Sequence, residues 1–128
     1  MHWQVPPSAE TKLFRVARGA IFDVIVDLRS GSTTYRRTYS TFLRDSDHRM
    51  LFVPEGFAQG FQTLEDDTEI TYQVTAPYSP TLGRGFRYDD PAFDIDWPLP
   101  VSTISEKDTS WAPYDDTMAM TLESSGAQ

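Results

Sequence analysis

The sequence predicts an all-β domain, either a sandwich or a barrel, on three observations. Short runs rich in Val, Ile, Phe, Thr and Tyr recur along the chain, separated by Gly, Pro, Asp or Ser. No long stretch of the chain repeats its apolar residues with the 3.6-residue period of an amphipathic helix. The length of 128 residues and the 39% apolar content are those of a single domain with a buried core.

Seven strands are predicted, each ending where turn-favouring residues begin. In order they are residues 12–18, 20–28, 34–41, 50–53, 57–64, 69–75 and 85–88. Beyond residue 90 the chain becomes Pro-rich and irregular, and a short helix is expected near 117–123. We therefore expect one domain over residues 1–114, followed by an acidic, flexible tail over 115–128.

The net charge of −8 is concentrated at the C-terminal end. Residues 1–88 contain ten acidic and ten basic side chains, whereas residues 89–128 contain nine acidic side chains and one base, Lys107. Nucleic acids attract clusters of Lys and Arg, and Arg36 and Arg37 are the only adjacent bases in the sequence. We therefore expect no nucleic-acid partner.

The lengths of the apolar runs and the absence of cysteine bear on where in the cell the protein is expected. The apolar runs are far shorter than the roughly 20 residues of a transmembrane helix, and Pro6 and Pro7 occupy the place of a signal peptide's apolar region. The absence of cysteine excludes disulfides, thiolate metal sites and cysteine nucleophiles. We expect a cytoplasmic protein without a membrane partner.

Strand alternation predicts three polar side chains on apolar faces, because neighbours on a strand point to opposite sides. Lys12 shares its face with Phe14 and Val16, Gln59 with Phe57 and Phe61, and Tyr72 with Ile70 and Val74. Three strands thus direct Lys12, Gln59 and Tyr72 toward one interior, as in a barrel with a ligand cavity. Alternatively, Tyr72 is a core residue with a satisfied hydroxyl, Lys12 extends to solvent, and Gln59 caps a strand end.

Several segments together resemble the dTDP-4-dehydrorhamnose 3,5-epimerases, metal-free cupins of deoxysugar biosynthesis. The segments are MHWQ, KLFRVARGAIFDVIVDLR, VPEGFAQGF, TYQVTAPYSP, RGFRYDDPAFDIDWPLP and SEKD. The resemblance covers most of residues 1–108 and implies a cupin-type jelly-roll barrel that needs no cofactor. It also implies a sugar-nucleotide substrate.

The resemblance implies a role for individual residues. His2, in the HWQ stretch, matches the family's catalytic base, and Asp108, in SEKD, matches the aspartate that pairs with it. Tyr72 matches the catalytic tyrosine. Four further residues match positions that contact the substrate or lie near it: Lys12, Gln59, Tyr78 and Lys107.

The family reaction inverts C3 and C5 beside the C4 ketone of a dTDP-4-keto-6-deoxyhexose. Each inversion removes a proton from one face, which forms an enolate, and returns a proton to the other face. His2, with an ordinary pKa of about 6.5, suits the base role, and Asp108 would fix its tautomer. Tyr72 would be the acid from the opposite sheet, and Lys12 would stabilise the enolate oxygen.

Three features depart from the family pattern. An Arg-Gly-x stretch and additional strands precede the family's histidine, whereas His2 here follows Met1; Gln59 replaces a second histidine, and Gly83 replaces a glutamate. Because a shortened chain would leave a sheet edge unpaired, we expect a homodimer. The alternative hypotheses are a truncated cupin that binds a sugar nucleotide without turnover, and a related isomerase or single-carbon epimerase.

No metal site is expected from the residues. Metal-binding cupins combine a close pair of histidines with a carboxylate. The two histidines of this chain, His2 and His48, are far apart in the sequence, and His48 is interpreted as a solvated residue in the turn at 45–49.

Overall fold

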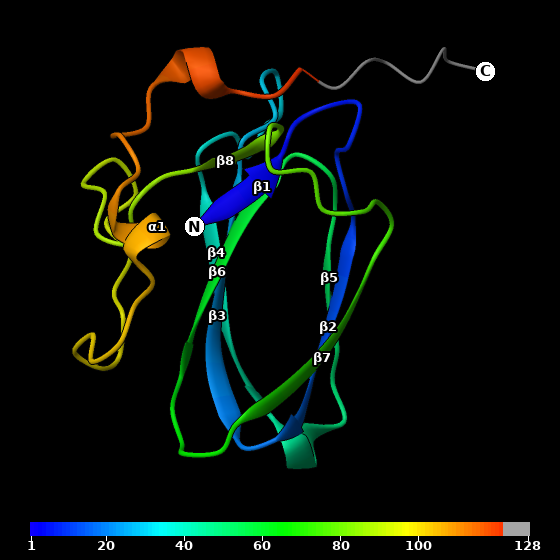
Figure 1. Ribbon diagram of the computed structural model, residues 1–128, viewed down its shortest axis with the longest axis vertical. Helices are drawn as coiled ribbons and strands as arrows, with labels where there is room; N and C mark the ends of the chain where they lie inside the picture. The colour runs from blue at the N-terminus through cyan, green and yellow to red at the C-terminus, as the bar shows by residue number, and fades with distance from the viewer. Residues whose placement is uncertain (122–128) are drawn as a thin grey trace.

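The structure, a computed structural model, describes residues 1–121, and its strands form two antiparallel sheets that lie face to face (Figure 1). The strands are β1 (His2–Gln4), β2 (Lys12–Arg18), β3 (Ala20–Asp27), β4 (Thr38–Arg44), β5 (Leu51–Val53), β6 (Phe57–Thr63), β7 (Glu69–Val74) and β8 (Gly83–Gly85). Short helical turns are η1 (Asp45–Asp47), α1 (Glu106–Thr109) and η2 (Asp116–Met118). The all-β prediction is confirmed.

The topology places the chain's first strand inside the larger sheet. Among the residues described, the larger sheet has the order β4-β3-β6-β1-β8 and the smaller has the order β5-β2-β7. In the register of β1 with its neighbours, His2 stands opposite Gln59 of β6 and opposite Gly85 of β8. The strand that carries His2 is therefore held on both edges.

Most predicted strands lie within a few residues of their observed bounds, and β4 shows the largest shift. It begins at Thr38 because the carboxylate of Asp27 accepts hydrogen bonds from the side chains of Arg29, Ser32 and Thr34 and holds the preceding segment as a loop. The prediction also placed the last strand at 85–88, where β8 covers Gly83–Gly85. Two short elements, β1 and α1, were not predicted.

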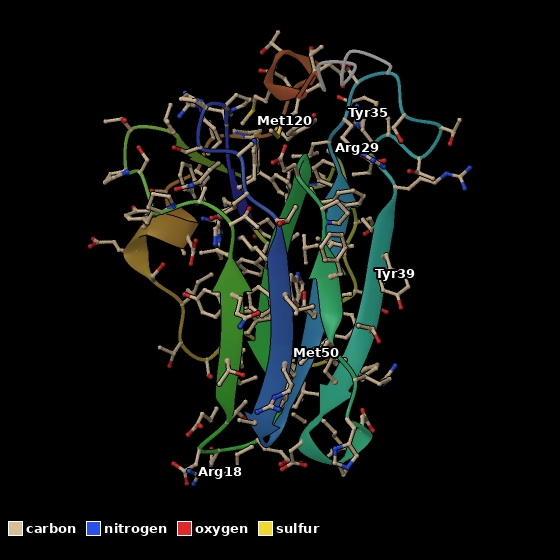
Figure 2. The ribbon with its side chains drawn as sticks, turned by 90° about the vertical axis from the view of Figure 1, so that its right-hand side faces the viewer. Arg18, Arg29, Tyr35, Tyr39, Met50 and Met120 are labelled. Atoms are coloured by element: carbon tan, nitrogen blue, oxygen red, sulfur yellow. The ribbon has the colours of Figure 1, made fainter. Side chains whose placement is uncertain are left out.

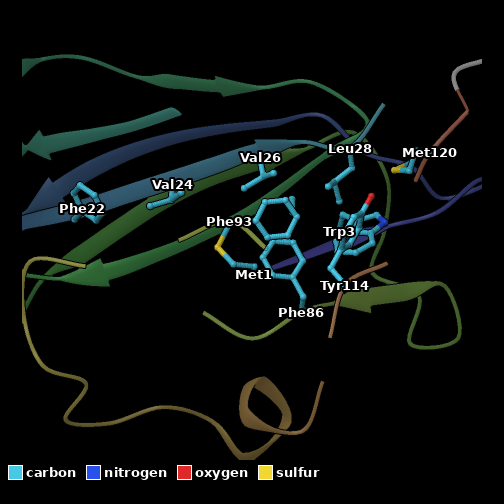
Figure 3. Close-up of a cluster of buried hydrophobic side chains, with 11 residues drawn as sticks. Met1, Trp3, Phe22, Val24, Val26, Leu28, Phe86, Phe93, Tyr114 and Met120 are labelled. Atoms are coloured by element: carbon cyan, nitrogen blue, oxygen red, sulfur yellow. The ribbon is translucent and has the colours of Figure 1, made fainter. Parts of the chain in front are cut away.

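The main apolar core lies outside the space between the sheets (Figure 3). It packs the outer face of the larger sheet against the irregular C-terminal segment. Trp3, Phe22 and Val24 from the sheet belong to one cluster with Phe86, Phe93, Tyr114 and Met120. Every residue of β3 is buried because this strand is covered on both faces.

A second apolar cluster occupies one end of the space between the sheets. Val16, Ile21 and Leu43 are buried there, with Leu51 and Ile70 packed against them. This cluster closes that end of the barrel. At the other end, the inner face carries polar side chains.

The C-terminal segment corrects the predicted domain boundary at residue 114. Met120 is only 4% exposed and forms a parallel bridge with Arg29, with backbone hydrogen bonds of 2.7 Å to Leu28 and 2.8 Å from Ser30. Figure 2 shows Met120 beside Arg29 and Tyr35 at one end of the molecule. Residues 115–120 therefore pack on the barrel instead of leaving it as a tail, while 122–128 lie outside the described residues.

The helix predicted near 117–123 corresponds in part to the 3-10 turn η2, and its last two residues lie outside the described part of the chain. Asp116 in that turn accepts a hydrogen bond from the hydroxyl of Tyr35 at 2.8 Å and pairs with Arg36 at 3.3 Å. Over residues 1–121, no helix combines the length and apolar character that crossing a membrane requires.

Candidate functional site

A pocket of about 450 Å³ opens between the two sheets, at the end away from the second apolar cluster. All seven side chains predicted to form the site line it: His2, Lys12, Gln59, Tyr72, Tyr78, Lys107 and Asp108. They come from β1, β2, β6, β7, the loop after β7, and α1. The structure thus brings together residues from both ends of the chain, although their individual roles stay predictions.

His2 lies between Gln59 and Gly85 on the inner face of the larger sheet. Desolvation, followed by the positive charge of Lys12, lowers the pKa of His2 from 6.5 to about 4. The open pocket nevertheless leaves its side chain accessible to solvent. At neutral pH the imidazole is therefore uncharged and able to accept a proton.

Asp108 lies in α1, a single turn that Ser105 caps. The Ser105 hydroxyl accepts from the backbone N–H of Asp108 at 3.1 Å and donates to its Oδ2 at 2.7 Å. Burial favours a higher pKa, but the Ser105 hydrogen bond and nearby positive charge hold the pKa of Asp108 below its ordinary value. Its negative charge favours protonation of His2. No hydrogen bond or ion pair joins them among residues 1–121, so direct pairing stays a prediction.

Lys12 points inward, as alternation predicted, and only 7% of it is exposed. Its ammonium lies 3.4 Å from a carboxylate oxygen of Glu10, which also lines the pocket. This orientation excludes the alternative in which Lys12 extends to solvent. Glu10, the counter-charge, was not predicted.

Tyr72 stands on the opposite wall, on β7. Its ring stacks on Phe14 of β2 with centroids 5.0 Å apart and an interplanar angle of 9°. The residue is 60% exposed, so the alternative of a buried core tyrosine is wrong. It faces the pocket and remains open to water, which suits a group that exchanges protons with solvent.

Lys107 and Tyr78 form a second polar region at the pocket. The Lys107 ammonium donates to the Tyr78 hydroxyl at 3.0 Å and lies 5.7 Å from the centroid of the Trp111 ring. Arg84 on β8 also lines the pocket. Together these cations provide positive charge suited to an anionic ligand.

The loop that carries Tyr78 is anchored by Gln4, which is 5% exposed. Its amide accepts from the backbone N–H of Ser79 at 2.7 Å and donates to the carbonyl of Pro77 at 3.2 Å. It also donates to the carbonyl of Ser8 at 2.9 Å. Gln4 thus bonds the backbone on both sides of Tyr78.

Gln59 is 2% exposed and donates through Nε2 to both carboxylate oxygens of Asp23 on β3. This contact excludes the alternative that Gln59 only caps a strand end. Asp23 was missed by sequence reasoning because it lies within the apolar run IFDVIV and no motif marks it. Trp111 was also missed, and nothing in the sequence pattern distinguishes it.

Metal ligands do not gather in the described part of the chain. No group of three or more His, Cys, Asp or Glu side chains there could hold a metal ion. His48 lies in an exposed turn with φ of 55°, apart from the pocket.

This combination defines a class: a jelly-roll barrel with a histidine, a tyrosine and lysines around an open pocket between its sheets. The sequence profile of the dTDP-4-dehydrorhamnose 3,5-epimerases matches residues 1–116. The chain belongs to this family.

Individual relatives agree with the family match. The chain is 50% identical, over 111 residues, to a dTDP-4-dehydrorhamnose 3,5-epimerase of Sinorhizobium fredii, covering 86% of this chain and 57% of the relative. The Bacillus anthracis dTDP-4-dehydrorhamnose 3,5-epimerase, solved with TDP and PPi bound, matches with a TM-score of 0.85 and 41% identity, covering 88% of this chain and 65% of that one.

A third relative was solved with a sugar nucleotide. It is the Legionella pneumophila dTDP-6-deoxy-D-glucose-3,5-epimerase in complex with dTDP-4-keto-L-rhamnose, with a TM-score of 0.87 and 32% identity over 95% of this chain and 66% of that one. These matches confirm the predicted jelly-roll fold. This chain spans little more than half the length of the Sinorhizobium protein.

Proposed function

We propose that this chain epimerises C3 and C5 of a dTDP-4-keto-6-deoxyhexose by acid–base catalysis through an enolate. The observation that carries the proposal is that His2 and Tyr72 line one pocket from opposite sheets. Inversion of a carbon needs one group on each face of the sugar ring, and these two side chains meet that requirement. The family membership and the two solved complexes of relatives support the substrate class.

In the first step of the proposed mechanism, neutral His2 removes the proton from a carbon beside the ketone. The electron pair of that C–H bond moves to form the enolate, whose oxygen the ammonium of Lys12 stabilises. Tyr72 then donates its hydroxyl proton to the opposite face of the carbon. Because both His2 and Tyr72 are reached by water, solvent returns them to their starting protonation states.

Solvent deuterium exchange tests this function. In D₂O, the C3 and C5 protons of dTDP-4-keto-6-deoxyglucose should be replaced, as followed by proton NMR. His2→Asn should lose about 10²–10⁴-fold in rate, the usual contribution of a proton-transfer group, whereas Tyr72→Phe should permit exchange and block inversion. His48→Asn, in an exposed turn, is the matched control and should behave as the unmodified chain. An intact protein that incorporates no deuterium would exclude the proposal.

Binding without turnover is the second candidate. It is favoured by the lack of a direct contact between His2 and Asp108 within the described residues, and by Gln59, which cannot carry a proton. Calorimetric binding of dTDP together with no deuterium incorporation would support this candidate.

We also propose that the chain forms a homodimer. The strands β4, β5, β7 and β8 end the two sheets, and Tyr39, Phe42 and Phe52 expose 55%, 55% and 59% of their surface. Exposed strand edges with large apolar side chains favour pairing with a second chain. Light scattering should give twice the chain mass of 14.6 kDa, and a mass of one chain would contradict the proposal.

A further inference from the structure

The contact between Asp23 and Gln59 fixes the orientation of an amide beside the pocket. Asp23 is fully buried on β3, and Nε2 of Gln59 lies 3.1 Å from its Oδ1 and 2.9 Å from its Oδ2. An ionised carboxylate only accepts hydrogen bonds. When Asp23 is ionised, the NH₂ end of the amide therefore faces it, and the carbonyl oxygen Oε1 points away from it.

The direction in which Oε1 points follows from the surroundings of Gln59. Gln59 is among the residues that line the pocket, whereas the fully buried Asp23 is not. Across residues 1–121, the buried side-chain atoms without a hydrogen-bond partner are Nε1 of Trp3 and Nε1 of Trp111, so Oε1 is not one of them. Since no hydrogen bond to Oε1 is formed in that range either, the oxygen is accessible from the pocket, beside the cross-strand neighbour His2.

We propose that Asp23 is a positioning residue that holds Gln59 as a hydrogen-bond acceptor, so that this part of the pocket binds a ring hydroxyl of the sugar. An oxygen at this position repels the lone pairs of a ketone and attracts an O–H. The ketone is thereby directed toward Lys12, and a hydroxyl on C2 or C3 toward Gln59. The inference rests on the proposed function, which supplies the keto-sugar.

The protonation of Asp23 bears on the same contact. Burial raises the pKa of Asp23 to about 7, opposed by the hydrogen bond from Gln59, by the charge of Lys12 on β2 and by the backbone N–H of Val24. A protonated carboxyl group can donate to Oε1, which would let the amide reverse. The fraction of molecules in which Oε1 of Gln59 points toward the pocket is therefore expected to increase as Asp23 ionises.

Substrate analogues test the hydroxyl contact. Rates of deuterium exchange would be compared for dTDP-4-keto-6-deoxyglucose and for its 2-deoxy and 3-deoxy analogues. The unmodified chain should lose roughly 10-fold in kcat/KM for the analogue that lacks the bound hydroxyl, the value of one hydrogen bond. Gln59→Leu and Asp23→Asn should lose that discrimination, and Gln62→Leu, on the outer face of the same strand, should retain it. Equal rates for all three substrates in the unmodified chain would overturn the proposal.

A measurement without substrate separates this inference from the proposed function. The side-chain NH₂ resonances of Gln59, observed by ¹⁵N NMR, should shift with pH around the titration of Asp23 and should not shift in Asp23→Asn. A resonance that neither titrates in the unmodified chain nor changes position in Asp23→Asn would overturn the positioning role of Asp23, whatever the activity. The expected titration in a chain that exchanges no deuterium would instead support the positioning role and reject the proposed function.

Discussion

Gly85 stands directly opposite His2 in the antiparallel pair of β8 and β1, and the indole of Trp111 lies over it. A Cβ on Gly85 would lie 2.3 Å from the Trp111 ring, so a larger residue would displace the indole. Trp111 also contacts the Lys107 ammonium. Because Gly85 has no side chain, Trp111 can pack over this strand and hold Lys107 at the pocket.

Gly85→Ala tests this packing. The added methyl should lower the free energy of unfolding by about 1–3 kcal/mol, as overpacking typically does, and should weaken nucleotide binding because Trp111 and Lys107 move. Gly83→Ala, on the same strand, is the control, because the nearest atom to its Cβ would be 3.9 Å away. Urea denaturation of both variants measures the difference, and equal stabilities would contradict the structural role of Gly85.

After desolvation, the charge of Lys12 should be the second influence on the pKa of His2. Because this charge contributes to the lowered pKa of His2, Lys12→Met should raise that pKa toward its ordinary value of 6.5. NMR titration of the imidazole would measure the shift. Arg18→Met, at the far end of β2 and exposed, should leave the pKa of His2 unchanged.

The pH–rate profile provides a second measurement of how the Lys12 charge affects the pKa of His2. The acid limb of kcat/KM for the unmodified chain should fall near pH 4, where His2 becomes protonated. In Lys12→Met, this limb should move to higher pH together with the pKa of His2. A limb that does not move would mean that His2 is not the base.

Asp23 should make folding stability depend on pH. Its pKa is raised to about 7 in the folded chain, whereas an exposed Asp titrates near pH 3.9. Between these values the folded state binds more protons than the unfolded state, so the contribution of Asp23 to stability is present at low pH and declines as pH rises to about 7.

Comparison with Asp23→Asn isolates this contribution. The stability of the variant relative to the unmodified chain should rise between pH 4 and 7, on the order of 1.4 kcal/mol for each unit of pKa shift. His2 has the opposite dependence, and the comparison removes it because both chains contain it. Urea unfolding at pH 4.5 and 7.5 is the measurement, and a constant difference between the two chains would show that Asp23 does not titrate in this range.

Gln4 should matter for nucleotide binding because it anchors the loop that carries Tyr78. Gln4→Leu removes three part-buried hydrogen bonds to the backbone of Ser8, Pro77 and Ser79, which should cost about 1–3 kcal/mol in unfolding free energy. It should also weaken binding of dTDP, since the loop with Tyr78 loses its anchor. Gln73→Leu, exposed on β7, is the matched control for stability. Unchanged dTDP affinity in Gln4→Leu would contradict the anchoring role.

The barrel and much of the pocket could be predicted from alternation. Lys12 and Tyr72 were assigned to the inner face from neighbouring apolar residues, and both line the pocket. His2 and Asp108 could be proposed only from resemblance to a family, because short segments at the two ends of a chain carry no periodic signal. Their placement in one pocket depends on pairing between distant strands and on the irregular segment that precedes α1.

The remaining features depend on packing that no local pattern records. The ionic partner of Lys12, Glu10, precedes its strand, and Asp23 lies within an apolar run in which both faces are buried. The expectation of a flexible tail from residue 115 also missed that Met120 belongs to the main core. A single methionine in an acidic, Pro-containing segment is too weak an apolar pattern to predict that the segment packs against the barrel.

The position of the main core outside the barrel has a consequence for biosynthesis of the chain. Trp3 and Phe22 leave the ribosome long before Tyr114 and Met120, which cover them in the finished fold. Until the last segment is made, the nascent sheet presents an apolar face to water, and such surfaces promote aggregation. The C-terminal segment, which is synthesised last, therefore covers this apolar face of the sheet. Premature termination near residue 100 would leave the face exposed and prone to aggregation, and would remove Lys107 and Asp108 from the pocket.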